Sequence, residues 1–202
     1  MPDKALIVVD VQNDFMPNGS LGVPQGDTII DPINALITRY NHVILTQDWH
    51  PPRHSSFAST HKVHAPYDVV PFIYGPQTLW PDHCIQGSFG ADFAKGLITS
   101  KAELILRKGY NRHIDSYSAF FENDHKTPTG LSSYLKERGI KEILLCGLAT
   151  DFCVGYSALD AIKNGFGVSV ALDACAGLDL NGSLNHMLKS MNEAGVKLFM
   201  IS

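Results

Sequence analysis

Cys146-Gly-Leu-Ala-Thr-Asp-Phe-Cys-Val-Gly-Tyr-Ser157 is the stretch of the sequence that decides the fold. The apolar run at 142–146 that leads into it is typical of a buried strand, because it is brief, continuous and bounded by Gly147. From Phe152 to Ile162, apolar residues recur at helical spacing, so a helix is predicted directly after the strand. A buried strand that passes through a short turn into a helix is the repeating unit of parallel α/β sheets.

Cys153 falls in the first turn of this predicted helix. A thiol there would feel the positive end of the helix dipole, which lowers its pKa and favours the thiolate. Thr150 and Asp151, just before it, are both residue types that cap helix N-termini. The pattern favours a cysteine nucleophile, but a small buried cysteine that packs behind the strand fits this stretch equally well.

The same alternation of strand and helix runs through the whole chain. The predicted strands cover residues 4–10, 42–47, 102–107, 142–146, 167–173 and 196–201, and the predicted helices cover 27–40, 91–96, 129–138, 152–162 and 183–194. Asp27 is a candidate N-cap, and Gly139 and Gly195 are candidate helix ends. We expect one α/β domain over residues 1–202, a Rossmann-like three-layer sandwich with a six-stranded, mainly parallel sheet and helices on both faces.

Residues 49–83 form one long segment without a clear strand or helix pattern. It contains six of the eleven prolines and five of the nine histidines. A loop of this length in a compact domain is usually functional or disordered, and the aromatic residues within it argue against disorder. We expect a metal- and substrate-binding loop region.

Composition and charge exclude several classes of partner. The chain has 202 residues, 45% hydrophobic and 18% charged, with a net charge of −4 and no basic stripe, so nucleic acid and anionic membranes are not expected partners. The N-terminal apolar run is too short for a signal peptide, and no segment is long enough to span a bilayer. The four cysteines lack a CxxC pair and are best interpreted as free thiols, which indicates a cytoplasmic protein.

Four chemically capable side chains follow predicted strands. They are Asp10, Asp48, Lys108 and Cys153. In an open α/β sheet, ligands bind outside the carboxyl ends of the strands, so these groups should share one rim. Taken singly, Asp10 could be a loop cap and Lys108 a solvated surface charge. Their joint occurrence favours an active site.

An acyl-transfer mechanism follows from these residue types. Cys153 would attack a carbonyl carbon as the thiolate, and Asp10 would take its proton and later deliver it to a leaving amine. Lys108 would hold Asp10 ionised or stabilise the thiolate. The backbone N–H groups of Ala149 and Cys153 form a candidate oxyanion hole, and amide hydrolysis is the simplest use of such a site.

A second cluster has the ligand types of a metal site. Asp48 and His50 are two residues apart, and His54 and His83 could complete the set. Carboxylate and imidazole ligands suit zinc, with iron or manganese as alternatives. Histidine-rich loops without a metal are also common, so the spacing leaves both interpretations open.

The motifs of the chain resemble the nicotinamidase/pyrazinamidase branch of the isochorismatase-like cysteine hydrolases. The matching motifs are Asp10-Val-Gln-Asn-Asp-Phe15, Asp48-Trp-His-Pro51, His54-Ser-Ser-Phe-Ala58, Trp80-Pro-Asp-His-Cys84, Arg107-Lys-Gly109 and Gly147-Leu-Ala-Thr-Asp-Phe-Cys-Val154. The resemblance extends over the whole chain.

The resemblance implies a role for each group in the site. Cys153, Asp10 and Lys108 would form the catalytic triad. Asp48, His50 and His83 would bind one divalent metal, commonly zinc or iron, and His54 would either bind it directly or contact a metal-bound water.

The resemblance also implies how a substrate ring is held. Phe15, Leu21, Trp80 and Tyr117 would line the ring pocket, and the metal would bind the pyridine nitrogen. A cis peptide bond before Ala149 would turn its N–H toward the oxyanion.

The activity implied is conversion of nicotinamide to nicotinate and ammonia through a Cys153 thioester, in NAD salvage, with pyrazinamide as a second substrate giving pyrazinoate. The branch that cleaves isochorismate lacks this cysteine, so Cys153 favours amides. The alternatives are a related amidohydrolase of carbamoyl or ureido compounds and a catalytically silent metal- or ligand-binding protein on the same fold. A monomer and a homo-oligomer are both compatible with the sequence.

Overall fold

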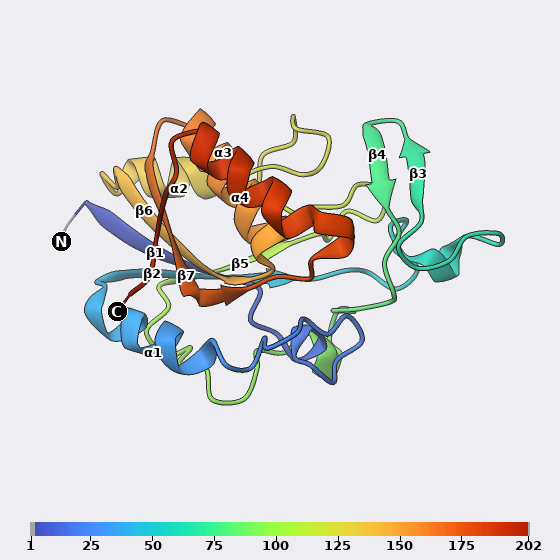
Figure 1. Cartoon of the computed structure of the whole chain (residues 1–202), viewed down its shortest axis with the longest axis horizontal. Helices are drawn as coiled ribbons and strands as arrows, with labels where there is room; N and C mark the ends of the chain where they lie inside the picture. The colour runs from blue at the N-terminus through green and yellow to red at the C-terminus, as the bar shows by residue number, and fades with distance from the viewer. Residues whose placement is uncertain (1–2, 202) are drawn as a thin grey trace.

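Six parallel strands form the centre of the computed structural model, which describes residues 3–201 (Figure 1). They are β1 (Lys4–Val9), β2 (His42–Asp48), β5 (Leu104–Lys108), β6 (Glu142–Leu148), β7 (Gly167–Ala176) and β8 (Lys197–Phe199). Their order across the sheet is β5-β2-β1-β6-β7-β8, and every neighbouring pair is parallel. The predicted sheet is confirmed, and β1 and β6 lie at its middle.

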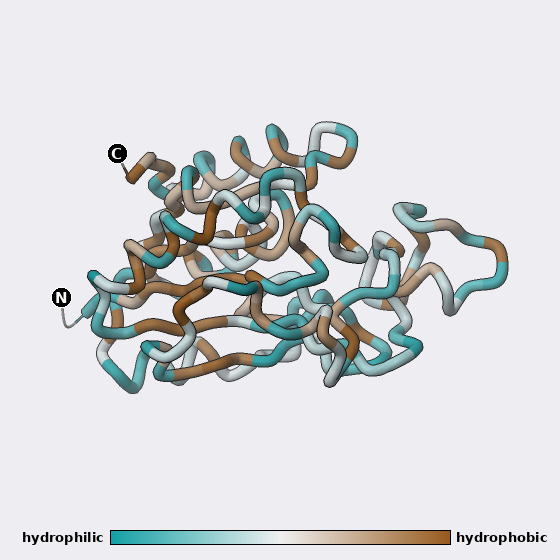
Figure 2. Tube along the Cα trace, turned by 90° about the horizontal axis from the view of Figure 1, so that it is seen from below, coloured by the Kyte–Doolittle hydropathy of each residue, from teal (hydrophilic) through white to brown (hydrophobic). Residues whose placement is uncertain are grey.

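Helices cover both faces of the sheet, which confirms the three-layer arrangement (Figure 1). Helix α1 (Ile30–Arg39) packs on one face, and α2 (Leu131–Glu137), α3 (Gly155–Lys163) and α4 (Ser183–Glu193) pack on the other. Alternate residues of β1 serve the two cores: Leu6 and Val8 join the α1 side, whereas Ile7 joins the other. The central strands β1 and β6 are therefore buried and hydrophobic along almost their whole length. Hydrophobic stretches of the trace run through the body of the domain in Figure 2.

Residues 49–83 contain more regular structure than predicted. Strands β3 (Val69–Phe72) and β4 (Gly75–Thr78) form an antiparallel hairpin that projects from the body of the domain (Figure 1). Pro71 and Pro76 lie opposite each other in it. Prolines argue against a strand in a sheet interior, but a two-stranded hairpin has only edge strands, which tolerate them.

Two of the predicted helices differ from the structure. Helix α1 begins at Ile30, and Ile29 rather than Asp27 occupies the N-cap position. The helix predicted at 91–96 is absent, because the chain there forms only a 3-10 turn, η3 (Phe89–Ala91), followed by a bridge to Gln12. Gly139 and Gly195 end α2 and α4 in the left-handed conformation, with φ of 71° and 87°, as predicted.

Among residues 3–201, no helix has the length and hydropathy needed to cross a membrane. All four cysteines are free thiols, as the sequence indicated.

Candidate active site

Lys108 is the centre of a buried cluster at the carboxyl ends of the strands. Its Nζ lies 2.8 Å from Oδ2 of Asp10, 2.5 Å from Oδ1 of Asp48 and 3.5 Å from Sγ of Cys153. It also donates to the carbonyl oxygen of Ser116 at 2.8 Å. Lys108 is only 1% exposed, so it is not a solvated surface charge.

The two carboxylates beside Lys108 differ in their electrostatics. Burial raises the pKa of Asp10 above its usual value, and the attraction of Lys108 offsets this only in part. Burial acts in the same direction on Asp48, but Lys108 and His50 hold the pKa of Asp48 well below its usual range. Two carboxylates whose pKa values are pushed apart suit different tasks, so Asp10 is the better proton acceptor and Asp48 stays ionised.

Thr46 fixes the orientation of Asp10. Its Oγ1 donates to Oδ1 of Asp10 at 2.5 Å and accepts from the Asp10 N–H at 3.1 Å. Asp10 itself has a left-handed φ of 48° directly after β1. One carboxylate oxygen of Asp10, one of Asp48 and the sulfur of Cys153 all lie within 4.8 Å of one another. Asp10 is thus held within reach of the Cys153 thiol.

Cys153 lies in the first turn of a helical segment, as predicted, but that turn is not α-helical. It belongs to η4 (Thr150–Val154), a π-helical turn, and α3 begins only at Gly155. Ala149 occupies the N-cap position without a side-chain cap, so the predicted capping by Thr150 and Asp151 is wrong. The Asp151 carboxylate accepts hydrogen bonds from residues 178–183 instead.

The expected lowering of the Cys153 pKa is also wrong. Burial raises the pKa of this thiol well above its usual value, although Lys108 opposes the shift. Burial disfavours the charged thiolate, and for Cys153, which is 7% exposed, this desolvation is the largest effect. The thiol therefore needs a neighbouring base, and Asp10 is in place to serve as one.

The peptide bond between Leu148 and Ala149 is cis, as the resemblance implied. Ala149 and Cys153 both line the pocket described below. Their N–H groups remain the candidate oxyanion donors.

Asp48, His50 and His83 form a compact set of candidate metal ligands. One ligand atom from each lies within 4.8 Å of the others. Oδ2 of Asp48 is 3.6 Å from Nε2 of His50 and 3.8 Å from Nε2 of His83.

The second nitrogen of each imidazole has a carbonyl partner. Nδ1 of His50 donates to the Gly109 carbonyl oxygen at 2.9 Å, and Nδ1 of His83 donates to that of Pro81 at 2.7 Å. Nε2 of both rings faces Asp48, and Nε2 of His50 is buried without a hydrogen-bond partner. A divalent cation fits these three residues.

His54 lies beside His50 but has other partners. Its Nε2 donates to the Asn111 carbonyl oxygen at 2.8 Å, and its Nδ1 accepts from the Ser56 N–H at 3.2 Å. Both ring nitrogens of His54 thus have partners within the chain, and its ring packs 4.5 Å from that of His50. His50, His54 and Asp115 also have ligand atoms within 4.8 Å of one another, so His54 stays a candidate ligand.

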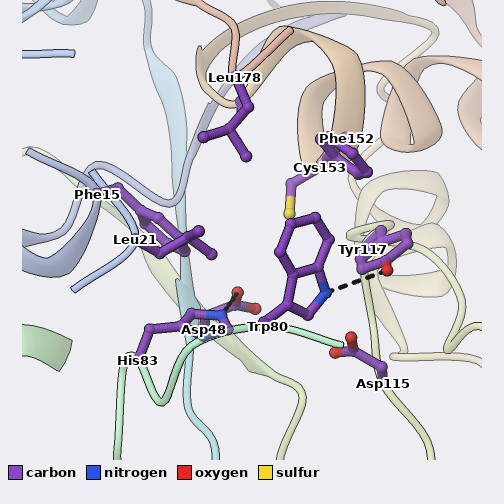
Figure 3. Close-up of a pocket in the computed structure, with 11 residues that line it drawn as sticks. Phe15, Leu21, Asp48, Trp80, His83, Asp115, Tyr117, Phe152, Cys153 and Leu178 are labelled. Carbon is purple, nitrogen blue, oxygen red and sulfur yellow. Dashed lines mark hydrogen bonds and ion pairs between the residues drawn. The ribbon is translucent and has the colours of Figure 1, made fainter. Parts of the chain in front are cut away.

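The pocket in front of Cys153 is shown in Figure 3. It is lined by Phe15, Leu21, Asp48, Trp80, His83, Asp115, Tyr117, Ala149, Phe152, Cys153 and Leu178. All four residues implied for the ring pocket are present. The indole N–H of Trp80 donates to the Tyr117 hydroxyl at 3.2 Å, which fixes both aromatic walls.

Three residues that line the pocket were not predicted from the sequence as site residues, namely Asp115, Phe152 and Leu178. Asp115 lies in an irregular polar segment with no motif. Leu178 follows the carboxyl end of β7 by two residues, so the rule that ligands bind at strand ends could have found it.

Comparisons with known proteins agree on one family. A model described as an isochorismatase domain matches residues 4–200. A curated nicotinamidase of Acinetobacter baylyi is 52% identical over 193 residues, which are 96% of this chain and 90% of the relative.

Three solved structures with similar folds are named for an activity, a bound ligand or a bound metal. A nicotinamidase and pyrazinamidase of Acinetobacter baumanii has a TM-score of 0.98 and 52% identity, covering 99% of this chain and 97% of its own. A protein of L. infantum in complex with nicotinate has a TM-score of 0.86 and 38% identity, covering 98% and 93%. A pyrazinamidase of Pyrococcus horikoshii in complex with zinc has a TM-score of 0.80 and 35% identity, covering 99% and 100%.

Proposed function

The chain belongs to the isochorismatase family, and on that premise we propose that it is an amide hydrolase that converts nicotinamide and water to nicotinate and ammonia, a step of NAD salvage. Pyrazinamide, which differs from nicotinamide by one ring atom, is the second substrate and gives pyrazinoate. The observation that carries the proposal is the buried contact of Lys108 with Asp10 and Cys153 at the floor of an aromatic pocket.

The proposed reaction has two halves that share Asp10. In the first, Asp10 takes the Sγ proton of Cys153 while the sulfur attacks the carboxamide carbon, and the N–H groups of Ala149 and Cys153 stabilise the oxyanion. Asp10 then passes the proton to the departing nitrogen, the C–N bond breaks, and ammonia leaves a thioester. In the second half, Asp10 takes a proton from water as the water oxygen attacks the thioester, and it returns that proton to the sulfur as the C–S bond breaks. Nicotinic acid leaves and ionises to nicotinate, and the thiol is restored. Lys108 balances the negative charge of Asp10 and of the sulfur throughout.

We propose that Asp48, His50 and His83 hold one divalent cation beside this pocket. Zinc is the first candidate, because it is the ion in the Pyrococcus horikoshii complex, and iron and manganese suit the same donor set. When bound, the ion supplies a Lewis-acidic partner for the ring nitrogen. Phe15 and Leu21 pack on the ring, and Trp80 and Tyr117 close its other side.

We also propose a domain organisation for the chain. Residues 1–202 form one hydrolase domain, a view supported by the family match over residues 4–200. Within it, residues 49–83 contribute two of the three candidate metal ligands, His50 and His83, and the pocket residue Trp80.

Ammonia release from nicotinamide tests the function. The wild-type protein should release ammonia and nicotinate in equal amounts, and Cys153→Ala should lose activity by at least about 10³-fold while still binding nicotinate. Trapping a nicotinoyl adduct on Cys153 by rapid acid quench and mass spectrometry would show the thioester. Equal rates in the two proteins would contradict the mechanism, and no ammonia from the wild type would contradict the function.

A further inference from the structure

Asp151 is a buried carboxylate that has no part in the proposed reaction. It lies two residues before Cys153 and is 2% exposed. Its oxygens accept from the Leu178 N–H at 2.9 Å, the Asp179 N–H at 2.8 Å and the Ser183 hydroxyl at 2.5 Å. All three donors belong to one segment, residues 178–183, which is distant in sequence.

This segment has little regular structure of its own. Apart from Ser183, the first residue of α4, it includes only the short turn η5 (Leu180–Gly182), and both Asp179 and Asn181 adopt a left-handed φ of 53°. Asp and Asn tolerate this conformation better than other non-glycine residues, and constraints from the surroundings select it here. Asp151 supplies such a constraint, because a carboxylate that accepts two consecutive backbone N–H groups fixes the path of the chain between them.

The chain also approaches Asp151 closely just before the segment begins. A Cβ atom added to Gly177 would lie 3.2 Å from Oδ1 of Asp151 and 3.1 Å from Cδ1 of Leu184. There is thus little room for the segment to shift toward the π-helical turn. The hydrogen bonds and this close packing together set the position of Leu178.

Leu178 is the one member of the segment that lines the pocket. In Figure 3 it enters near Cys153, from the opposite end of the view to His83 and Asp115. It therefore forms the part of the wall away from the candidate metal ligands. A ring whose nitrogen points toward those ligands would present its other carbon atoms to Leu178.

We propose that Asp151 is a positioning residue that holds Leu178 in the pocket wall and thereby makes the enzyme discriminate nicotinamide from amides with a bulkier ring. The inference rests on the proposed function and adds a determinant of specificity to it. Asp151 acts through the 178–183 segment, and its own carboxylate does not touch the substrate.

The substitution Asp151→Asn tests this with little change in shape. An amide has one acceptor oxygen and turns an NH₂ group toward a donor, so at least one of the three bonds is lost. Asp173→Asn is the matched control, because Asp173 likewise accepts a backbone N–H, that of Ile201, at 3.0 and 2.9 Å, but Ile201, unlike Leu178, does not line the pocket.

Three measurements give separate readouts. In Asp151→Asn, hydrogen exchange of residues 177–183 should become faster, and the KM for nicotinamide should rise about 10-fold while kcat changes by less than about 3-fold. The ratio of kcat/KM for nicotinamide to that for 5-methylnicotinamide should fall by about 10-fold. Asp173→Asn should leave all of these values at wild-type levels.

Two further variants keep the test decisive if Asp151→Asn fails to fold. Leu178→Ala should lower the same discrimination ratio directly, and Ser183→Ala, which removes only the hydroxyl donor, should change exchange and KM in the same direction but by less. A wild-type ratio in Leu178→Ala, or faster exchange without a change in the ratio in Asp151→Asn, would overturn the inference.

Failure of the proposed function has a different signature. In that case the wild type would release no ammonia from nicotinamide, whereas hydrogen exchange and nicotinate binding would still report whether Asp151 holds the segment. An active wild type with unchanged discrimination in every variant would reject only the role of Asp151 and Leu178.

Discussion

Asp48 and Lys108 are joined by a 2.5 Å hydrogen bond from Nζ to Oδ1, while the other carboxylate oxygen of Asp48 faces His50 and His83. One residue thus belongs to both the candidate metal set and the charge cluster around Cys153. The two parts of the site are neighbours through a single carboxylate, and substitutions in either part should be interpreted with that link in mind.

Lys108→Met should destabilise the protein strongly as well as inactivate it. The substitution leaves the Asp10 and Asp48 carboxylates buried without their common cation, a change that typically costs about 3–5 kcal/mol. Urea unfolding measures the free energy. Lys101→Met is the control, because Lys101 only reaches the carbonyls at the end of α1, and a change of within about 0.5 kcal/mol is expected. Equal stability of the two variants would show that the cluster does not depend on Lys108.

The metal content of histidine variants should show which histidines bind the ion. His50→Ala and His83→Ala should lose most bound metal after dialysis, whereas His54→Ala should retain it, because both ring nitrogens of His54 already have partners. Elemental analysis of the purified proteins gives the metal-to-protein ratio. Metal loss in His54→Ala as complete as in His50→Ala would place His54 among the direct ligands.

Removal of the metal should act mainly on substrate binding. The residues that carry out bond breaking, Cys153 and Asp10, come from the chain itself, whereas the ion is proposed to hold the ring nitrogen. After chelation and verified metal loss, the KM for nicotinamide should rise by at least about 10-fold, with recovery on adding Zn²⁺. Benzamide, which lacks the ring nitrogen, is the matched substrate whose KM should not respond. An unchanged KM for nicotinamide would contradict the proposed role of the ion.

Gly147→Ala should be far more damaging than Gly139→Ala, although both glycines have a positive φ. A Cβ at Gly147 would lie 2.1 Å from the carbonyl oxygen of Val9 in the neighbouring strand, whereas nothing lies within 4 Å at Gly139. We expect a loss of about 4 kcal/mol or more at Gly147 and about 1 kcal/mol at Gly139, measured by urea unfolding. Similar losses would mean that β1 and β6 can separate without cost.

The sheet and the cluster at its rim could be predicted because one physical rule covers both. Strands buried on two faces are continuously apolar, so the polar residues that follow each apolar run mark its carboxyl end. Asp10, Asp48 and Lys108 were found in this way, and parallel pairing places such residues on one edge.

The predictions from the sequence that are wrong concern features that depend on distant parts of the chain. The side chain of Asp151 caps residues 178–183 rather than its own helix, because those N–H groups compete for it in the folded protein. The pKa of Cys153 is raised by burial, and that burial is created by segments from across the chain. Local propensity carries no information on either.

Thr46→Val should move the acid limb of the pH profile of kcat/KM to higher pH. Burial raises the pKa of Asp10, and the hydrogen bond from Thr46 Oγ1 opposes that shift by stabilising the ionised carboxylate. Valine has nearly the same shape but no hydroxyl, so the pKa of Asp10 should rise further. Because Asp10 must be ionised to accept the Cys153 proton, activity should then be lost at a higher pH as the solution is acidified.

A hydrogen bond to a charged group is worth about 1.5 kcal/mol, which corresponds to a shift of about one pH unit. Thr46→Ser keeps the hydroxyl and should preserve the acid limb of the wild type. Thr38→Val is the second control, because it removes a hydroxyl that donates to the Ala35 carbonyl in α1, away from the site. An acid limb that stays in place in Thr46→Val would show that another group controls it. A shift to lower pH would contradict the assignment of Asp10 as the base, because losing a donor to its ionised form cannot make that form easier to reach.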